Sequence, residues 1–284
     1  MPGPQFIFGH CPTCAESYRL PSNTLGRRAR CRACDAIFVV QPADDGAQQA
    51  ASGESSIIRH QKRDRGFELA VGESGTIDAI SDHIQRYLGA VRTVFHEIVS
   101  DLVHVDVHWV QPSEARPWYT LVTSGMSDRP MNAPPEMRAC RHAELMTCLP
   151  PDWRLTQEDF KNESWYWPIR WLKILARFPH EYDTWLWEGH TIPNGDPPEP
   201  FADNTQFCGV MLLPPITAPP EFATLTVGDK TISFFSMIPL YPDEMDHKIA
   251  HGIKSLLPRF EKHGVTDIID VNRRSVCRRR LGLW

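Results

Sequence analysis

The sequence predicts an α+β fold in which a mixed β-sheet domain is flanked by helices and preceded by a small cysteine-rich unit. Three observations support this prediction. Two Cys-x-x-Cys pairs lie within residues 11–34, residues 41–56 contain no aromatic or β-branched side chain, and the remainder alternates between strand-like and helix-like hydrophobic periodicity. We therefore expect a small unit at residues 1–40, a flexible linker at 41–58 and a body at 59–284.

The composition permits a large hydrophobic core. Of the 284 residues, 42% are apolar and 23% are charged, which suits one large domain with a small one attached. There is no apolar run of about eighteen residues and no basic segment followed by a long apolar stretch, so neither a membrane span nor a secretory signal is expected. The predicted location is the cytoplasm, where paired cysteines are more often metal ligands than disulfides.

The cysteine pairs of the small unit have the spacing of a zinc site. Cys11 and Cys14 enclose two residues, and so do Cys31 and Cys34. A two-residue spacing lets one tight turn aim both sulfurs at the same point, and two such turns complete a tetrahedral site. We expect one structural zinc ion with no open coordination position. Two disulfides or a redox-active pair are the alternatives.

The same segment resembles the small zinc-ribbon at the N-terminus of many bacterial proteins. The resemblance includes the CPTC and CRAC motifs, a Tyr-Arg-Leu-Pro stretch at 18–21 and the apolar run 37–40. Residues 1–40 carry five arginines against two acids, and residues 273–284 carry five arginines, which leaves the rest of the chain with a net charge of −13. A basic ribbon that contacts DNA or RNA is therefore one hypothesis, although the acidic body is atypical of dedicated nucleic-acid binders.

The body begins with a predicted helix and strands. Apolar residues recur at helical spacing from Ile77 to Leu88, and Gly89 can end that helix. Residues 103–109 alternate strictly, with valines and Trp109 on one face and polar side chains on the other, which predicts a strand with one buried face. The following WYTLVTSG segment is predicted to form the neighbouring strand, which ends at Gly125.

Further elements follow in the same mixed order. We expect helices around Glu144–Met146, over the aromatic segment 164–178 and from Pro242 to Leu257. We expect strands within 205–213 and 265–271 and a hairpin that turns at Gly228-Asp229. Strands in both hairpin and separated arrangements, with helices between them, indicate an α+β domain.

One group of polar residues has the side-chain types of a metal site. His104, Asp106 and His108 lie on one predicted strand face, with His96 and Glu97 nearby. Residues two apart on a strand are about 7 Å apart, too far for three ligands to reach one ion without a bend. We therefore expect these side chains to face solvent or a groove, and a metal-dependent enzyme using this face remains a second alternative.

Several separated pieces of the body, over residues 66–276, resemble the Suppressor of fused domain of bacterial type. The matching pieces are FHEIVSDLVHVDV at 95–107, LVTSGMS at 121–127, AELM at 143–146, LARFPHEYDTWLWEGHTIP at 175–193, MLLPP at 211–215, FFSMIPLYPDEM at 234–245 and VTDIIDVNRRS at 265–275. Their order and spacing carry the resemblance.

This resemblance implies a non-enzymatic protein-binding module. Animal members of the family capture an extended peptide of a transcription factor, and many bacterial members resemble immunity proteins that neutralise toxins. The expected partner is a basic toxin or regulatory protein, held in a groove or at a sheet edge. The predicted partner-binding or supporting residues are Glu97, Asp106, Glu144, Trp185 and Trp187.

Overall fold

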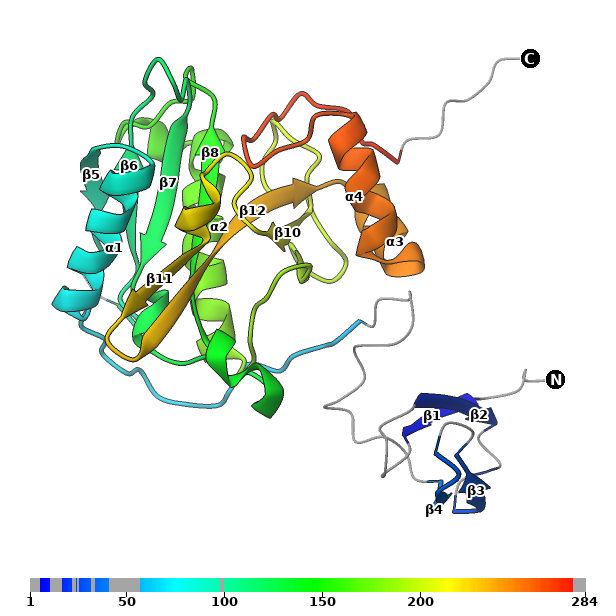
Figure 1. Cartoon of the computed structure of the whole chain (residues 1–284). Coiled ribbons are helices and arrows are strands. Elements are labelled where there is room, and N and C mark those ends of the chain that lie inside the picture. The colour runs from blue at the N-terminus through cyan, green and yellow to red at the C-terminus, as the bar shows by residue number, and fades with distance from the viewer. Residues whose placement is uncertain are drawn as a thin grey trace, which may run out of the picture. The chain divides into compact units, whose positions relative to one another are not determined.

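The computed structural model describes residues 6–10, 17–21, 24, 26–31, 34–40, 57–97 and 100–277. The chain divides into two compact units, Met1–Ser56 and Ile57–Trp284. Figure 1 shows the helices and strands of both. No helix in the described residues is long and apolar enough to cross a membrane.

The N-terminal unit contains two small antiparallel hairpins. β1 (Phe6–His10) pairs with β2 (Ser17–Pro21), and β3 (Arg28–Arg30) pairs with β4 (Ile37–Val39). The described core of this unit consists of Cys31, Phe38 and Val40. A unit of about 40 residues can bury only a limited apolar area, and units of this size generally need a cross-link or a metal ion to fold.

The body is built on one mixed sheet with the strand order β5-β6-β7-β8-β12-β10-β9, and β11 pairs with β12. The strands are β5 (Val91–Phe95), β6 (Asp106–Val110), β7 (Tyr119–Ser124), β8 (His142–Leu149), β9 (Thr191–Pro193), β10 (Gly209–Leu213), β11 (Thr224–Val227) and β12 (Lys230–Leu240). β8 and β12 run parallel, and the other pairs are antiparallel. This sheet and its helices confirm the predicted α+β class.

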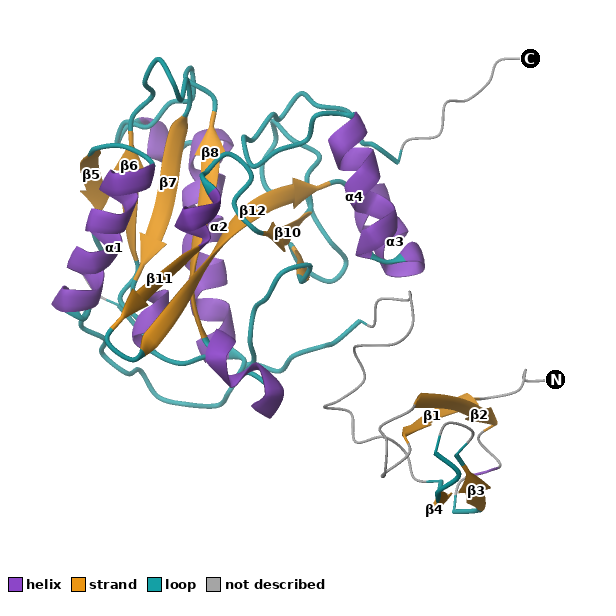
Figure 2. Ribbon diagram, viewed as in Figure 1, coloured by secondary structure: helices purple, strands orange, loops and turns teal. Residues whose placement is uncertain are grey.

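Helices cover both faces of the sheet. Figure 2 shows α1 (Ser74–Tyr87) in front of the strands and α2 (Glu163–Glu181) behind them. α1 packs Ile80 and Ile84 into one core cluster, and α2 packs Trp167 and Leu172 into another. α3 (Pro242–His251) and α4 (Ile253–Lys262) close a third cluster over β10 and β12.

Several predicted elements are confirmed. α1 spans the predicted helix, and Gly89 follows it with φ +123°, a conformation that favours glycine. The hairpin of β11 and β12 turns at Gly228-Asp229, and β10 occupies the predicted buried strand. α2 also forms as predicted although Pro168 lies in its interior. The carbonyl of Ser164, which loses its helical donor to this proline, accepts a hydrogen bond from the Asn204 amide instead.

The helix predicted around Glu144–Met146 is wrong, because these residues lie in β8. β8 is central in the sheet, between β7 and β12. Its residues from Ala143 to Leu149 are all buried. Burial on two sheet faces overrides the helix propensity of Ala, Glu, Leu and Met.

The strand predicted at 265–271 is also wrong. This segment makes a single parallel bridge, between Cys148 and Ile268, and no ladder. The predicted continuous helix after Pro242 is interrupted as well. Gly252 adopts φ +76° and separates α3 from α4.

The polar side of the 103–109 segment does not face solvent. Asp106 and His108 are 2% and 1% exposed, because α1 and its neighbours cover that face of the sheet. The regular strand moreover begins only at Asp106. His104 therefore lies in the preceding bend rather than on the strand.

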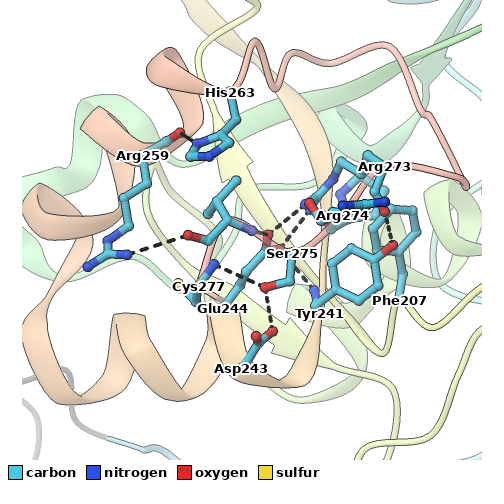
Figure 3. Close-up of polar contacts among 12 residues, drawn as sticks. Phe207, Tyr241, Asp243, Glu244, Arg259, His263, Arg273, Arg274, Ser275 and Cys277 are labelled. Atoms are coloured by element: carbon cyan, nitrogen blue, oxygen red, sulfur yellow. Dashed lines mark hydrogen bonds and ion pairs between the residues drawn. The ribbon is translucent and has the colours of Figure 1, made fainter. Parts of the chain in front are cut away.

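An ion pair joins Arg273, in the segment after α4, to Glu244 in α3. Arg273 donates two hydrogen bonds to the fully buried carboxylate of Glu244, at 2.6 and 2.7 Å. Its guanidinium also lies over the rings of Phe207 and Tyr241 (Figure 3). Glu244 further accepts from the backbone of Tyr241, at the start of α3.

We predict that Arg273→Ala lowers the free energy of unfolding by about 3–5 kcal/mol, because it leaves the Glu244 carboxylate buried without its partner. Chemical denaturation measures this. Arg274→Ala is the matched control, because that side chain is exposed, and its effect should stay within about 0.5 kcal/mol. Equal effects of the two variants would contradict the assignment.

Candidate partner-binding edge and polar cluster

β5 is an open edge of the sheet. Among the described residues, those from Val91 to Phe95 make no backbone hydrogen bond apart from the ladder with β6. The Phe95 ring packs against the rings of Trp109 and Phe160, with centroids 5.6 and 5.2 Å away. The edge is therefore held in place by its side chains, and its outward backbone groups are available to another strand.

An apolar stripe lies on the extended segment before α1. Phe67, Leu69 and Val71 are 65%, 66% and 84% exposed, and they alternate along the chain. The segment is fixed beside residues 100–102, because the Ala70 N–H donates to the Ser100 carbonyl and the Leu102 N–H donates to the Glu68 carbonyl. This stripe was not singled out in the sequence, where its FELAV alternation is the only signal.

A polar cluster joins the end of β5 to the start of β6. His96 Nδ1 lies 2.9 Å from Asp106 Oδ2, and His104 Nε2 lies 3.1 Å from Asp106 Oδ1. His104 Nδ1 lies 2.9 Å from Ser100 Oγ, whose hydroxyl donates to Glu97 Oε2 at 2.8 Å. We call His96, Glu97, Ser100, His104 and Asp106 the polar cluster.

Two cations of α2 pair with Glu97. Lys173 Nζ lies 3.5 Å from one carboxylate oxygen, and Arg177 pairs with the other. Burial raises the pKa of Glu97, but the hydrogen bonds from Arg177 and Ser100 outweigh it and leave that pKa below its usual value. Glu97 thus ties the polar cluster to the helix behind the sheet.

His108 does not join this cluster. Its Nε2 lies 2.9 Å from Ser124 Oγ, and burial lowers its pKa to about 4. The ring is therefore neutral at pH 7. The sequence grouped His108 with His104 and Asp106. In the structure the β5–β6 ladder, which ends at Phe95↔Val107, places His96 beside Asp106, and the bend before β6 brings His104 to the same carboxylate.

The cluster does not have the geometry of a serine nucleophile. Ser100, His104 and Asp106 lie in a row, but Ser100 is 2% exposed and its hydroxyl proton is directed at Glu97. A nucleophilic serine needs an accessible oxygen whose proton passes to the histidine.

Glu144 occupies the interior of the sheet. Its carboxylate is fully buried and accepts hydrogen bonds from the Thr123 hydroxyl and from both the N–H and the hydroxyl of Ser127. Burial outweighs these donors and raises the pKa of Glu144 to about 7. The position supports the fold, and a contact with a partner at this residue stays a prediction.

Trp185 and Trp187 are both half-buried. Their rings stack with centroids 6.3 Å apart, and Trp187 packs edge-on against Phe235 at 5.1 Å. Part of each indole remains accessible, so these residues can contact a partner. That role, too, stays a prediction.

The second cysteine pair, Cys31 and Cys34, lies in a tight turn. The Cys34 N–H donates to Cys31 Sγ at 3.4 Å, and the Asp35 N–H donates to the Cys31 carbonyl at 3.0 Å. A backbone N–H that donates to sulfur, as that of Cys34 does, suits a thiolate, the form that binds zinc. Cys11 and Cys14 lie outside the described residues.

A cavity of about 300 Å³ is lined in part by Arg273. Its lining includes Phe207, Pro239, His263 and Arg274. Figure 3 shows Arg274 and His263 in the region of Arg273. This cavity is not foreseeable from the sequence, because β12 and the segment after α4 that line it meet only in the folded chain.

Known proteins share this fold. Residues 101–274 match the family model described as Suppressor of fused protein (SUFU). A SUFU homolog from Neisseria gonorrhoeae FA 1090 matches with a TM-score of 0.54 at 17% identity, covering 73% of this chain and 100% of that chain. The structure described as the Sufu-Fu complex matches with a TM-score of 0.51 at 13% identity, covering 71% of this chain and 92% of that chain.

A third structure, Drosophila Suppressor of Fused, matches with a TM-score of 0.47 at 13% identity over 70% of this chain and 50% of that chain. No curated protein matches the chain. At these identities the structural matches show a shared fold alone.

We predict that Glu144 makes stability depend on pH. Its folded pKa of about 7 lies above the ordinary value of 4.5, so the folded state holds a proton that the unfolded state releases. This stabilising contribution is complete below pH 4.5 and is lost as the pH rises through about 7.

The comparison with Glu144→Gln isolates the effect. From pH 8 to pH 5, the unfolding free energy of the wild type should rise by about 2 kcal/mol relative to the variant. Urea denaturation at each pH measures both proteins, and parallel curves would contradict the prediction.

Proposed function

Because the chain belongs to the Suppressor of fused family, we propose that it is a non-enzymatic protein-binding module that captures an extended polypeptide along the open edge of β5. The observation that carries this proposal is that, among the described residues, the backbone of Val91–Phe95 has no partner on the side facing away from β6. Strand addition at such an edge supplies affinity through main-chain hydrogen bonds, and neighbouring side chains supply specificity.

The apolar stripe adds a second contact. Phe67, Leu69 and Val71 expose apolar area in one row, and their segment is bonded to Ser100 in the polar cluster at the end of β5. A bound polypeptide that follows β5 past His96 reaches this region. Burying the row gains about 25 cal/mol for each Å² of apolar surface covered.

The charge of the body favours a basic partner. Residues 57–272 carry a net charge of −10, and the five arginines of residues 273–284 bring that of the whole body to −5. A net negative charge accelerates encounter with a cationic polypeptide and disfavours acidic ones. A toxin neutralised by an immunity-type protein is the partner that we propose on this basis. The Sufu-Fu complex supports protein binding for a protein of the same fold.

Proline substitutions in β5 test the proposed edge. Neighbouring N–H groups of a strand point in opposite directions, so one of Thr93→Pro and Val94→Pro removes a ladder donor and the other removes an outward donor. Thermal unfolding identifies the variant with the intact ladder. Wild type and variants are then used to select from a display library of random 15-residue peptides.

We expect the wild type to enrich basic peptides with alternating apolar residues. The stable proline variant should bind them at least about tenfold more weakly, which corresponds to about 1.4 kcal/mol for a lost main-chain hydrogen bond. Leu69→Ser should weaken them without affecting folding, since that side chain is 66% exposed. Undiminished binding by the stable proline variant would contradict edge capture.

We further propose that the cysteine-rich unit is a zinc-ribbon held by Cys11, Cys14, Cys31 and Cys34. The turn at Cys31–Cys34 supports this, because the Cys34 N–H donates to Cys31 Sγ and is placed to stabilise a thiolate there. Metal binding would supply the folding free energy that its small core lacks, on the order of 10–16 kcal/mol for structural zinc. A contact between the basic ribbon and DNA or RNA stays the alternative hypothesis for its role.

Cobalt substitution tests the ribbon. Co²⁺ bound by thiolates has intense charge-transfer absorption, which nitrogen and oxygen ligands do not produce. The full chain should show this absorption at one equivalent of Co²⁺, and Cys34→Ser should reduce it strongly. Cys277→Ser is the control and should leave it unchanged. A spectrum that Cys34→Ser does not alter would contradict the four-thiolate site.

A further inference from the structure

We propose that His96, His104 and Asp106 bind a divalent transition-metal ion at the junction of β5 and β6. This site is separate from the ribbon and goes beyond partner capture. One ligand atom from each residue lies within 4.8 Å of the others, and no other group of three such side chains is found in the described part of the chain. The two closest ligand pairs are 2.9 and 3.1 Å apart, close to the spacing of atoms that share an ion about 2 Å away.

The direction of the hydrogen bonds indicates that a cation belongs between His104 and Asp106. The Glu97 carboxylate, ion-paired with Lys173 and Arg177, can only accept, so the Ser100 hydroxyl donates to it. Ser100 Oγ is then left to accept from His104 Nδ1. His104 Nδ1 therefore carries the hydrogen, and its Nε2 presents a lone pair.

That lone pair faces a carboxylate oxygen. His104 Nε2 lies 3.1 Å from Asp106 Oδ1, and two lone pairs at this distance repel each other. Either a second proton on the imidazole or a metal ion removes the repulsion. A second imidazole, that of His96, approaches the other oxygen of the same carboxylate, so a single ion can satisfy all three groups.

The surroundings hold the ligands in this arrangement. Ser100 Oγ fixes the tautomer of His104 by accepting from Nδ1. Metal-bound histidines usually have a hydrogen-bond acceptor of this kind on the ring nitrogen that does not bind the ion. The Glu97 N–H donates to Asp106 Oδ1 at 3.3 Å. Gly72 lies against the His104 ring, where a Cβ atom would approach Cδ2 to 3.2 Å. The chain is therefore packed closely around His104.

The charges are compatible with a bound cation. Asp106 supplies one negative charge, while Glu97 with Lys173 and Arg177 leaves a charge of +1, so these four side chains together are neutral before an ion binds. The Asp106 side chain is 3% exposed and that of His96 is 68% exposed. The site is thus anchored in the sheet and open to solvent on the His96 side, with three protein ligands and room for another.

The ligand types select the class of ion. Two imidazoles and one carboxylate suit zinc and its neighbours in the first transition row, whereas magnesium and calcium prefer oxygen ligands alone. Zinc is the probe of choice because its geometry adapts to three protein ligands and one water.

The experiment uses the full chain with the ribbon thiolates disabled. Replacing both cysteine pairs (Cys11→Ser/Cys14→Ser and Cys31→Ser/Cys34→Ser), called the double-cysteine background, removes all four ligands of the ribbon, so zinc bound to this background reports on the body. Isothermal titration with zinc chloride should give one equivalent per chain. Adding His96→Ala should abolish this binding, and because His96 is largely exposed, the unfolding temperature in chelator should stay unchanged.

Two further variants sharpen the result. Ser100→Ala removes the outer partner of His104 and should weaken zinc binding by about 10–100-fold. His263→Ala is the control, because this exposed histidine lies at the end of α4, and it should leave the affinity unchanged. Absence of zinc binding in the double-cysteine background, or zinc binding that survives His96→Ala, would overturn the proposal. Peptide selection does not depend on this outcome, so partner capture and metal binding can fail separately.

Discussion

The parallel pairing of β8 with β12 is the constraint on which the body depends. Every other strand pair of the large sheet is antiparallel and belongs to one of two groups, β5 to β8 or β9 to β12. The five paired positions from Ile232↔His142 to Ser236↔Met146 join these groups into one sheet. The long connection between them contains α2, which packs back onto the sheet.

This arrangement explains why some elements were predictable and others were not. α1 is amphipathic and lies on the surface, so its helical periodicity is visible in the sequence. β8 is buried on both faces between two neighbours, so its residues show no alternation, and AELM is indistinguishable from a helix. The break at Gly252 depends on how α3 and α4 pack, which one glycine in a helical pattern does not reveal.

The same reasoning applies to the candidate sites. The spacing of the cysteines predicts metal ligands because that chemistry is local. The grouping of His96 and His104 on Asp106 depends instead on the pairing of β5 with β6 and on the bend before β6. Leu102 adopts φ +68° in that bend. The residues around it then return toward the end of β5, and Ser100 and His104 come within hydrogen-bond distance. The buried Glu244–Arg273 pair likewise joins residues distant in sequence.

The open edge of β5 also has a consequence for solubility. A strand with one open edge can pair with the same strand of another copy, and flat apolar edges are the usual starting points of aggregation. β5 carries two features that oppose such joining. A register shift between Val91 and Thr93 distorts the strand, and the charged Arg92 is exposed beside it. Two copies that approach edge to edge bring their guanidinium groups together and meet an irregular ladder, so the edge that can accept a foreign polypeptide disfavours its own duplicate.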